Sequence, residues 1–203
     1  AMKVGIEKVR ELSGQGYKII ATGEMGIGNT TTSSALASYF LQEDVEKMTG
    51  RGAGLTSKAL EKKIAVVRKA IADYSPAFTD AIDALAALGG FDIAGMAGVF
   101  LGGAIYRVPI VMDGFISSTA ALTATRICPA CKDFIMASHV SKEPAAEKIL
   151  AAMDKEAALH CDMCLGEGTG AVTLFPILDL ATQIYEQMST FEDIEIDAYV
   201  ELK

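Results

Sequence analysis

The 203-residue sequence has no tryptophan and only two histidines, His139 and His160, so no Ser-His-Asp arrangement can be argued from it. Basic residues are also scarce. Lys and Arg number 18 against 26 Asp and Glu, the net charge is −8, and no basic run exceeds a dipeptide. A nucleic-acid partner is therefore not expected.

Long hydrophobic runs are absent as well. The longest one, Ile93 to Tyr106, has 14 residues between Asp92 and Arg107, whereas a membrane span needs about 20. The run is therefore interpreted as a buried, closely packed element. The first 16 residues carry charges throughout and show no secretory signal, so a cytoplasmic location is expected. Ala1 before Met2 indicates an expression remnant or a trimmed product of a longer chain.

The remaining composition favours a large core, because 51% of the residues are hydrophobic and the mean hydropathy is +0.31. Short apolar segments alternate with segments of helical periodicity, which is typical of βαβ units. We predict an α/β fold: a three-layer αβα domain with a mostly parallel, Rossmann-like sheet, plus helices of a partial small domain. One domain covers 1–203, and whether about 180–203 joins a small helical domain is left open. Strands are predicted at 17–22, 108–115 and 133–139; helices at 4–12, 30–42, 57–74, 79–88, 116–127 and 143–153; a strand or turn into helix at 92–106; and a glycine loop opening a helix at 165–188.

The stretch "ATGEMGIGNTTTSSAL", residues 21–36, has the features of a phosphate-binding loop. It is neither a Walker A motif nor a dinucleotide fingerprint, because no Gly-Lys-Ser/Thr follows and the third glycine position is Thr31. Gly26 and Gly28 still lead into a helix whose first N–H groups, near Asn29 and Thr30, attract an oxyanion. The alternative is a plain glycine-rich turn from strand to helix.

Two glutamates lie in glycine loops, where a phosphate-binding loop should avoid negative charge. Glu24 suits sugar hydroxyls, a ring N–H or a cation. Glu167 lies between Gly166 and Gly168, which let a ligand approach closely. Against Leu165 and a flat apolar ligand, Glu167 is expected to be shielded from water and to act as general base for a ring N–H. The alternative is a turn in which Glu167 is merely exposed beside a helix start.

Several other polar residues are candidates. Lys63 lies on the apolar stripe of its helix, which indicates either a bound anion, such as phosphate, or a side chain that snorkels to water. Asp113 ends a strand where ribose or metal ligands often lie, although a turn Asp before Gly114 is common. Asp92 allows the same two interpretations. His139 could orient a loop or touch a ligand on the rim shared by the carboxyl ends of the strands.

The four cysteines form two C-x-x-C pairs, Cys128/Cys131 and Cys161/Cys164. The 29-residue gap between the pairs is longer than in typical zinc ribbons, and both pairs are expected within regular segments. Small buried hydrophobic residues are therefore favoured over a metal or redox site. No metal, cofactor or disulfide is expected.

At "GEMGIGNTTTSSAL" and "LGEGTGA" the sequence resembles the nicotinate-nucleotide:dimethylbenzimidazole phosphoribosyltransferases, the CobT family. The likeness continues in order through "GRGAGL", "KKIAVV", "GGFDIAGMAG", "VMDGFISSTAAL" and "ASHVSKE", and so covers most of the chain. It implies phosphoribosyl transfer from nicotinate mononucleotide to a benzimidazole-type base. The products are nicotinate and the α-ribazole phosphate of the cobamide (vitamin B12) lower ligand. A homodimer is implied too.

The resemblance also implies roles for particular residues. Glu167 matches the family's catalytic base, Glu24 its first-loop glutamate, and Lys63 its phosphate-contacting lysine. The expected substrate-binding residues are Met25, Gly26, Gly28, Asn29, Thr30, Gly52, Gly54, Lys63, Gly90, Asp92, Asp113, Gly114, Leu165, Gly166 and Gly168.

Two departures accompany the resemblance. Family chains extend upstream of the region that resembles Ala1, so an N-terminal part that supplies some of the base pocket is expected to be missing here. Cys164 stands where an Arg or an apolar residue is common. An alternative function is therefore a non-catalytic or incomplete nucleotide-binding subunit that needs a missing segment or a partner chain; a zinc-stapled scaffold is a more distant one. Benzimidazole, purine and phenolic bases all remain open.

Overall fold

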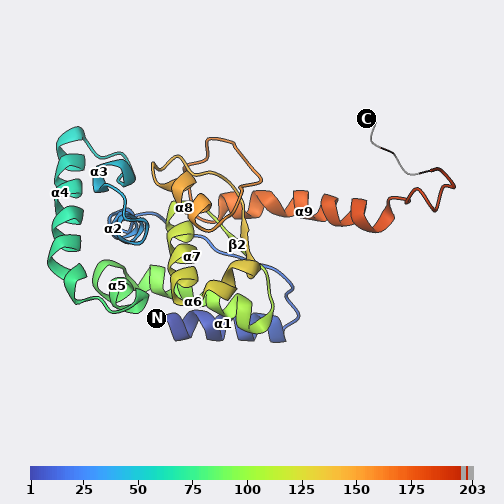
Figure 1. Ribbon diagram of the computed structural model, residues 1–203, viewed down its shortest axis with the longest axis horizontal. Helices are drawn as coiled ribbons and strands as arrows, with labels where there is room; N and C mark the ends of the chain where they lie inside the picture. The colour runs from blue at the N-terminus through green and yellow to red at the C-terminus, as the bar shows by residue number, and fades with distance from the viewer. Residues whose placement is uncertain (198–199, 201–203) are drawn as a thin grey trace.

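A computed structural model of the chain describes residues 1–197 and residue 200, and helices dominate it (Figure 1). The helices are α1 Met2–Gly14, α2 Thr30–Leu41, α3 Val45–Met48, α4 Ser57–Tyr74, α5 Ala81–Leu88, α6 Phe91–Tyr106, α7 Phe115–Ile127, α8 Ala146–Ala152 and α9 Thr169–Gln187, with 3-10 turns η1 Ser75–Ala77 and η2 Pro129–Phe134. The strands are β1 Ile20–Ala21, β2 Ile110–Met112 and β3 Ile135–Ala137.

The three strands form one parallel sheet in the order β1-β2-β3. Ile110 in the central strand pairs with Ile20 on one side and with Ile135 on the other. The predicted α/β class with a parallel sheet is confirmed, although each strand is shorter than the apolar segment that predicted it. The sheet is small because helices carry most of the core.

Helices cover both faces of this sheet. Ile110 and Met112 belong to the main core, which includes side chains of α6 and α7. Val111 points the other way, since successive strand residues alternate between faces, and packs with Ala171 and Leu174 of α9. The sheet therefore lies between a large helical layer and the single helix α9.

Helices α1 and α6 pack against each other along a contact that we call the α1–α6 seam. A Cβ atom on Gly5 would lie 2.1 Å from the Gly95 carbonyl oxygen, and one on Gly98 would lie 2.0 Å from the Met2 carbonyl oxygen. Both positions therefore require glycine. The close packing predicted for the apolar run is confirmed, and the whole run is helical rather than partly strand.

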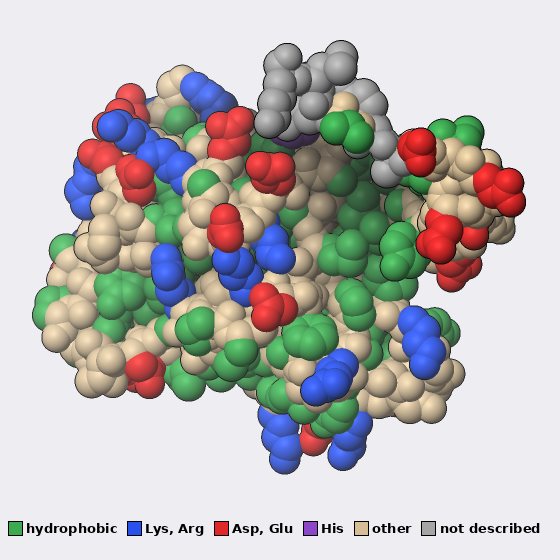
Figure 2. Space-filling model, turned by 45° about the vertical axis from the view of Figure 1, so that its right-hand side comes forward, with side chains coloured by type: hydrophobic (Ala, Val, Ile, Leu, Met, Phe, Trp, Pro, Cys, Tyr) green, Lys and Arg blue, Asp and Glu red, His purple; other side chains and the backbone are tan. Residues whose placement is uncertain are grey.

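Helix α9 runs from the sheet outward and projects beyond the body (Figure 1). Its outer half exposes large apolar side chains, including Leu180 (57%), Ile184 (49%) and Tyr185 (90%), and the exposed Met188 (70%) follows directly. Figure 2 shows hydrophobic side chains gathered along the hollow between the body and this projecting part. Whether 180–203 joins a small helical domain remains a prediction, and 198–199 and 201–203 of that segment lie outside the described residues.

The two cysteine pairs differ in environment. Cys131 is fully buried, as predicted, and burial raises the pKa of its thiol to about 12; Cys128 is half-buried. Cys161 and Cys164 are exposed, so the prediction of buried cysteines in a regular segment is wrong for them, because the chain between Leu159 and α9 is irregular. No cluster of metal-binding side chains occurs within the described ranges, and no helix there is long and apolar enough to span a bilayer.

Candidate active site

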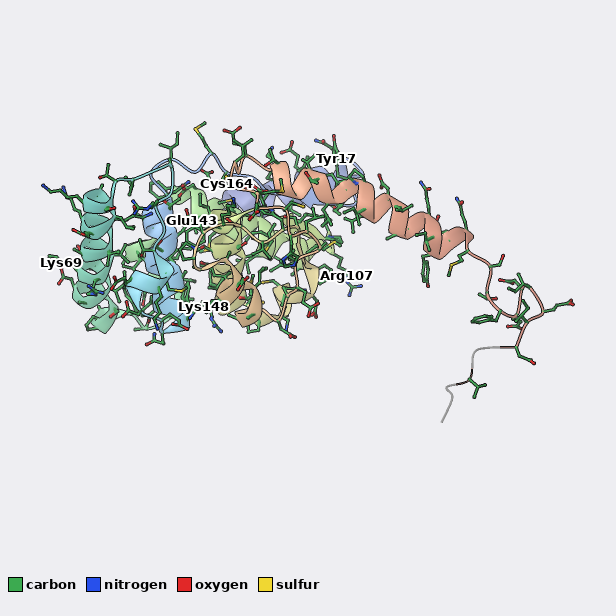
Figure 3. All side chains as sticks on the ribbon, turned by 90° about the horizontal axis from the view of Figure 1, so that it is seen from above. Tyr17, Lys69, Arg107, Glu143, Lys148 and Cys164 are labelled. Carbon is green, nitrogen blue, oxygen red and sulfur yellow. The ribbon has the colours of Figure 1, made fainter. Side chains whose placement is uncertain are left out.

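A cavity of about 540 Å³ opens where the chain leaves the carboxyl ends of the three strands. This is the predicted rim, and the volume suits a small-molecule ligand. Glu143 and Cys164 mark two of the lining loops in Figure 3. Of the expected site residues, nine line the cavity: Glu24, Met25, Gly26, Thr30, Gly52, Asp113, Gly114, Leu165 and Gly166. Eight do not: Gly28, Asn29, Gly54, Lys63, Gly90, Asp92, Glu167 and Gly168.

The two glutamate loops meet directly, backbone to backbone. The Glu167 N–H donates to the Glu24 carbonyl oxygen at 2.8 Å. A Cβ atom on Gly23 would lie 2.5 Å from the Gly168 nitrogen, so only a glycine permits this approach. Residues far apart in the sequence thus place their two glutamates on adjoining turns.

Asp113 holds the second of these loops in place. Its carboxylate is 2% exposed and accepts hydrogen bonds from the N–H groups of Gly168 (3.0 Å), Gly170 (2.9 Å) and Ala171 (3.1 Å). These are donors at the start of α9 that no helical carbonyl can satisfy, and the helix dipole favours a negative charge there. Asp113 therefore anchors the loop, and its expected ligand contact remains a prediction.

The backbone of this loop is strained. Gly166, Glu167 and Gly168 all adopt positive φ angles, of 77°, 59° and 82°. For Glu167, which has a Cβ, the left-handed conformation costs about 1 kcal/mol. Its side chain is exposed among the described residues, and its expected shielding by Leu165 and a flat apolar ligand remains a prediction.

Glu24 is held by a neighbour. Asn29 Nδ2 donates to Glu24 Oε1 at 2.5 Å and to Asp92 Oδ2 at 2.8 Å. Asn29 is 7% exposed, and its Oδ1 has no partner among the described residues. Asn29 is the N-cap residue of α2, but its side chain makes no capping hydrogen bond in the described ranges. The start of α2 therefore presents first-turn N–H groups to the loop.

Lys63 connects α2 to the loop of residues 50–54. The residue is 6% exposed, and its Nζ donates to Thr30 Oγ1 and to the Gly50 carbonyl oxygen, each at 2.9 Å. Burial lowers the pKa of the Lys63 ammonium, while the nearby Glu143 carboxylate opposes that shift. The head group thus bonds protein oxygens rather than reaching for water. Its expected phosphate contact remains a prediction.

Sequence reasoning missed six polar cavity residues: Thr49, Arg51, Ser117, Ser141, Lys142 and Glu143. The Arg51 guanidinium bonds the Leu55 carbonyl oxygen at 2.7 Å and Ser57 Oγ at 3.1 Å, which orients it within its loop. Arg51 and Lys142 bring positive charge to the lining. Arg51 and Lys142 lie in "GRGAGL" and "ASHVSKE", two segments that carry the family resemblance. A basic residue within such a loop was therefore the signal that could have identified them.

Together these features define an α/β ligand-binding domain with a rim cavity, an uncapped helix start, cationic side chains and two adjoining glutamate loops. Comparison with known proteins gives the family. The family model described as phosphoribosyltransferase matches residues 1–196. The chain belongs to this phosphoribosyltransferase family, as the resemblance of its loops implies.

Individual relatives agree with the family match. The chain is 53% identical over 202 residues to the nicotinate-nucleotide–dimethylbenzimidazole phosphoribosyltransferase of Clostridium acetobutylicum, and 50% identical over 199 residues to that of Acetivibrio thermocellus. These alignments cover 100% and 98% of this chain and 57% of each relative. The crystal structure of CobT from Thermus thermophilus is 35% identical, with a TM-score of 0.89 over 95% of this chain and 57% of that one. The chain thus spans less than two thirds of the length of these relatives.

Proposed function

We propose that this chain carries the site for phosphoribosyl transfer from nicotinate mononucleotide to a benzimidazole-type base, giving nicotinate and the α-ribazole phosphate of the cobamide lower ligand. The observation that carries the proposal is the hydrogen bond between Glu167 and Glu24, which joins two glutamate loops at the edge of a cavity that Arg51 and Lys142 help to line. The names of the relatives and the family match support it.

The arrangement suggests how the donor substrate lies. The N–H groups at the start of α2, with Arg51, Lys142 and the neighbouring Lys63, suit the phosphate. A phosphate placed there directs the ribose toward the junction of the glutamate loops. Glu24, held by Asn29, then faces the ribose. Glu167 lies where the attacking base must arrive.

The reaction is a displacement at the anomeric carbon. The base nitrogen forms a bond to that carbon, and Glu167 takes the proton from the ring N–H. The bond to nicotinate breaks, and its electron pair returns to the pyridinium nitrogen, which becomes neutral. Because the leaving group is already cationic, the step needs neither a metal nor a cofactor.

The exposed Glu167 carboxylate is compatible with this role. Met25, Ile27 and Leu165 are apolar and strongly exposed, at 64%, 74% and 66%. A flat aromatic base that covers such side chains removes them from water and shields a neighbouring carboxylate at the same time. Water exclusion at Glu167 would then arise from substrate binding.

The test measures nicotinate release from nicotinate mononucleotide and dimethylbenzimidazole. Glu167→Gln removes the base at constant size, and we expect kcat to fall about 10²- to 10⁴-fold. Glu61→Gln, an exposed glutamate on α4, is the matched control and should retain full activity. Unchanged turnover in Glu167→Gln would overturn the assignment.

A second function, a non-catalytic or incomplete nucleotide-binding subunit, is favoured by the uncovered Glu167 and by the partial coverage of the relatives. The same assay separates the two proposals. Binding of nicotinate mononucleotide without nicotinate release would support the binding subunit, whereas release by this chain alone would exclude it.

We also propose a homodimer, and we retain the cytoplasmic location expected from the sequence. The exposed apolar side chains on the outer half of α9 support an assembly, because large exposed apolar patches mark interaction sites. Light scattering after gel filtration tests it: a mass near 43 kDa, twice the 21.4 kDa of the chain, is expected.

A further inference from the structure

His139 has no part in the transfer mechanism, yet it is buried at the cavity wall. The residue follows β3, is 5% exposed and lines the cavity. Its ring presses against the start of α9, where a Cβ atom on Gly170 would lie 1.9 Å from Nδ1. The ring therefore has little freedom to turn, and its two nitrogens face fixed surroundings.

The hydrogen bonds around the ring determine its tautomer. Ser138 Oγ donates its single proton to the Met112 carbonyl oxygen at 2.7 Å. Only lone pairs then remain on Ser138 Oγ for His139 Nδ1, which lies 3.0 Å away. Nδ1 must therefore carry the ring proton and donate it. Asp113 Oδ1, 4.0 Å from Nδ1, favours the same arrangement.

A second proton on the ring is disfavoured. Burial lowers the pKa of His139, although the Asp113 carboxylate opposes that shift. His139 Nε2 is thus a bare acceptor, and it has no hydrogen-bond partner in the described part of the chain. A Cβ atom on Gly114 would lie 3.7 Å from Nε2 and 3.8 Å from Ser141 Oγ. Nε2 therefore lies beside Gly114, which lines the cavity.

This chemistry limits what can bind at Nε2. Phosphate dianions and carboxylates offer only acceptors at neutral pH, so they repel a bare ring nitrogen. A hydroxyl group offers the proton that Nε2 lacks. A sugar hydroxyl therefore suits this position, whereas phosphate suits the cationic side chains of Arg51 and Lys142 in the cavity lining.

We infer that His139 Nε2 accepts a hydrogen bond from a ribose hydroxyl of the bound donor, so that the site selects ribose over deoxyribose. The inference rests on the proposed function, since it places the phosphoribosyl group in this cavity. A binding site built around a hydrogen bond discriminates against an analogue that lacks the hydroxyl. One such bond to a neutral acceptor corresponds to about a tenfold preference.

Ligand binding tests this selection without requiring turnover. Calorimetry compares nicotinate mononucleotide with its 2-deoxyribose and 3-deoxyribose counterparts. We expect the unmodified chain to prefer the ribose form about tenfold over one of them. His139→Asn keeps a donor near the Nδ1 position and removes the Nε2 acceptor, so the preference should disappear. His139→Gln places an oxygen near the Nε2 position and should restore part of it.

Outcomes against the inference are distinct from outcomes against the proposed function. Equal affinity of the unmodified chain for all three ligands, or an unchanged preference in His139→Asn, would overturn the selection by His139 while leaving phosphoribosyl transfer intact. Failure of the unmodified chain to bind any of the three ligands would overturn both.

A spectroscopic measurement addresses the tautomer itself. The chain has only two histidines, so nitrogen NMR of 15N-histidine-labelled protein, with His160→Asn for assignment, resolves the His139 ring. We expect a protonated Nδ1 and a bare Nε2, and ribose 5-phosphate should shift the Nε2 resonance whereas inorganic phosphate should not. A protonated Nε2, or an equal response to both ligands, would contradict the inference.

Discussion

The loops that carry Glu24 and Glu167 hold their carboxylates in opposite ways. Glu24 is half-buried, and its side chain is bound by Asn29 from the same loop. Glu167 has an exposed side chain, and its position is set by its backbone and by Asp113, which follows β2. The Glu24 carboxylate is therefore fixed before any ligand binds. For Glu167 only the backbone is fixed, and the carboxylate makes no hydrogen bond among the described residues.

The difference suits the two proposed tasks. A group that contacts the ribose gains from a fixed position, because positioning lowers the barrier of the reaction. A general base that must accept a proton from an incoming ring gains from an open approach. The strain in the Glu167 backbone persists because the three hydrogen bonds to Asp113 over-determine it. Substitutions at the junction of the two loops should therefore have larger effects than substitutions that affect one loop alone.

Gly23→Ala should have the largest effect, because it disrupts the junction itself. The new methyl group would meet the Gly168 nitrogen at 2.5 Å and the Gly168 Cα at 2.6 Å, and neither backbone atom can rotate away. We expect the free energy of unfolding to fall by about 3 kcal/mol and any nicotinate release to fall about 100-fold. Urea denaturation and the release assay measure the two effects.

Gly14→Ala is the control for that substitution, since a Cβ atom there has nothing within 4 Å. It should change the free energy of unfolding by less than about 1 kcal/mol. Equal losses in the free energy of unfolding for Gly23→Ala and Gly14→Ala would show that Gly23 and Gly168 are not packed as closely as their distances imply.

Asp113→Asn should loosen only the second loop. The amide oxygen can still accept from two N–H groups of α9, but the amide nitrogen then opposes a third donor. We expect the free energy of unfolding to fall by about 2 kcal/mol. Asp133→Asn, at an exposed position that forms no side-chain hydrogen bond in the described residues, should stay within about 0.5 kcal/mol. Coincident urea midpoints for the two variants would contradict the anchoring role of Asp113.

Asn29→Ala should loosen only the first loop. Glu24 and Asp92 lose their shared donor, and the two carboxylates then repel each other. We expect a loss of about 1 kcal/mol in the free energy of unfolding and a raised KM for nicotinate mononucleotide. Gln183→Ala, on the exposed outer half of α9, is the control and should leave KM unchanged. A KM in Asn29→Ala equal to the control value would show that Glu24 does not depend on its neighbour.

The smallest effect concerns pH. Burial lowers the folded-state pKa of His139 below its ordinary value of 6.5, so the unfolded chain takes up a proton first as the pH falls. The stability due to neutral His139 is thus complete above pH 6.5 and is lost below it, at no more than about 1.4 kcal/mol per pH unit. Urea midpoints between pH 7 and pH 5 measure this loss. The stability of His139→Asn should depend less on pH than that of the unmodified chain. Parallel pH profiles of the two proteins would refute a contribution from neutral His139.

Much of the fold could be predicted because local pattern determines it. Short apolar segments between helical segments gave the strands, and the helical stripe of 57–74 gave α4. The run from Ile93 to Tyr106 was harder, since its many glycines mimic a turn. Gly98 and Gly102 are needed because α1 packs closely against them. The pattern within residues 93–106 does not reveal which distant segment packs there.

The site shows the same limit. Glycine loops with misplaced charges pointed to Glu24 and Glu167, and the cavity does lie at that rim. The partners of these loops could not be found in this way: Asp113 lies 55 residues before Gly168, and Asp92 lies 63 residues after Asn29. The exposure of Glu167 and of Cys164 also depends on which segments cover the loop, and local pattern does not encode that.

The glycines of the α1–α6 seam differ in how far they tolerate substitution. Gly95 supplies the oxygen that approaches Gly5 most closely, yet a methyl group on Gly95 itself would point into open space. A saturation scan should therefore accept alanine at Gly95 and reject it at Gly5, although the two residues touch. A replacement for the first helix must therefore keep a glycine at position 5, just as α6 must keep Gly98.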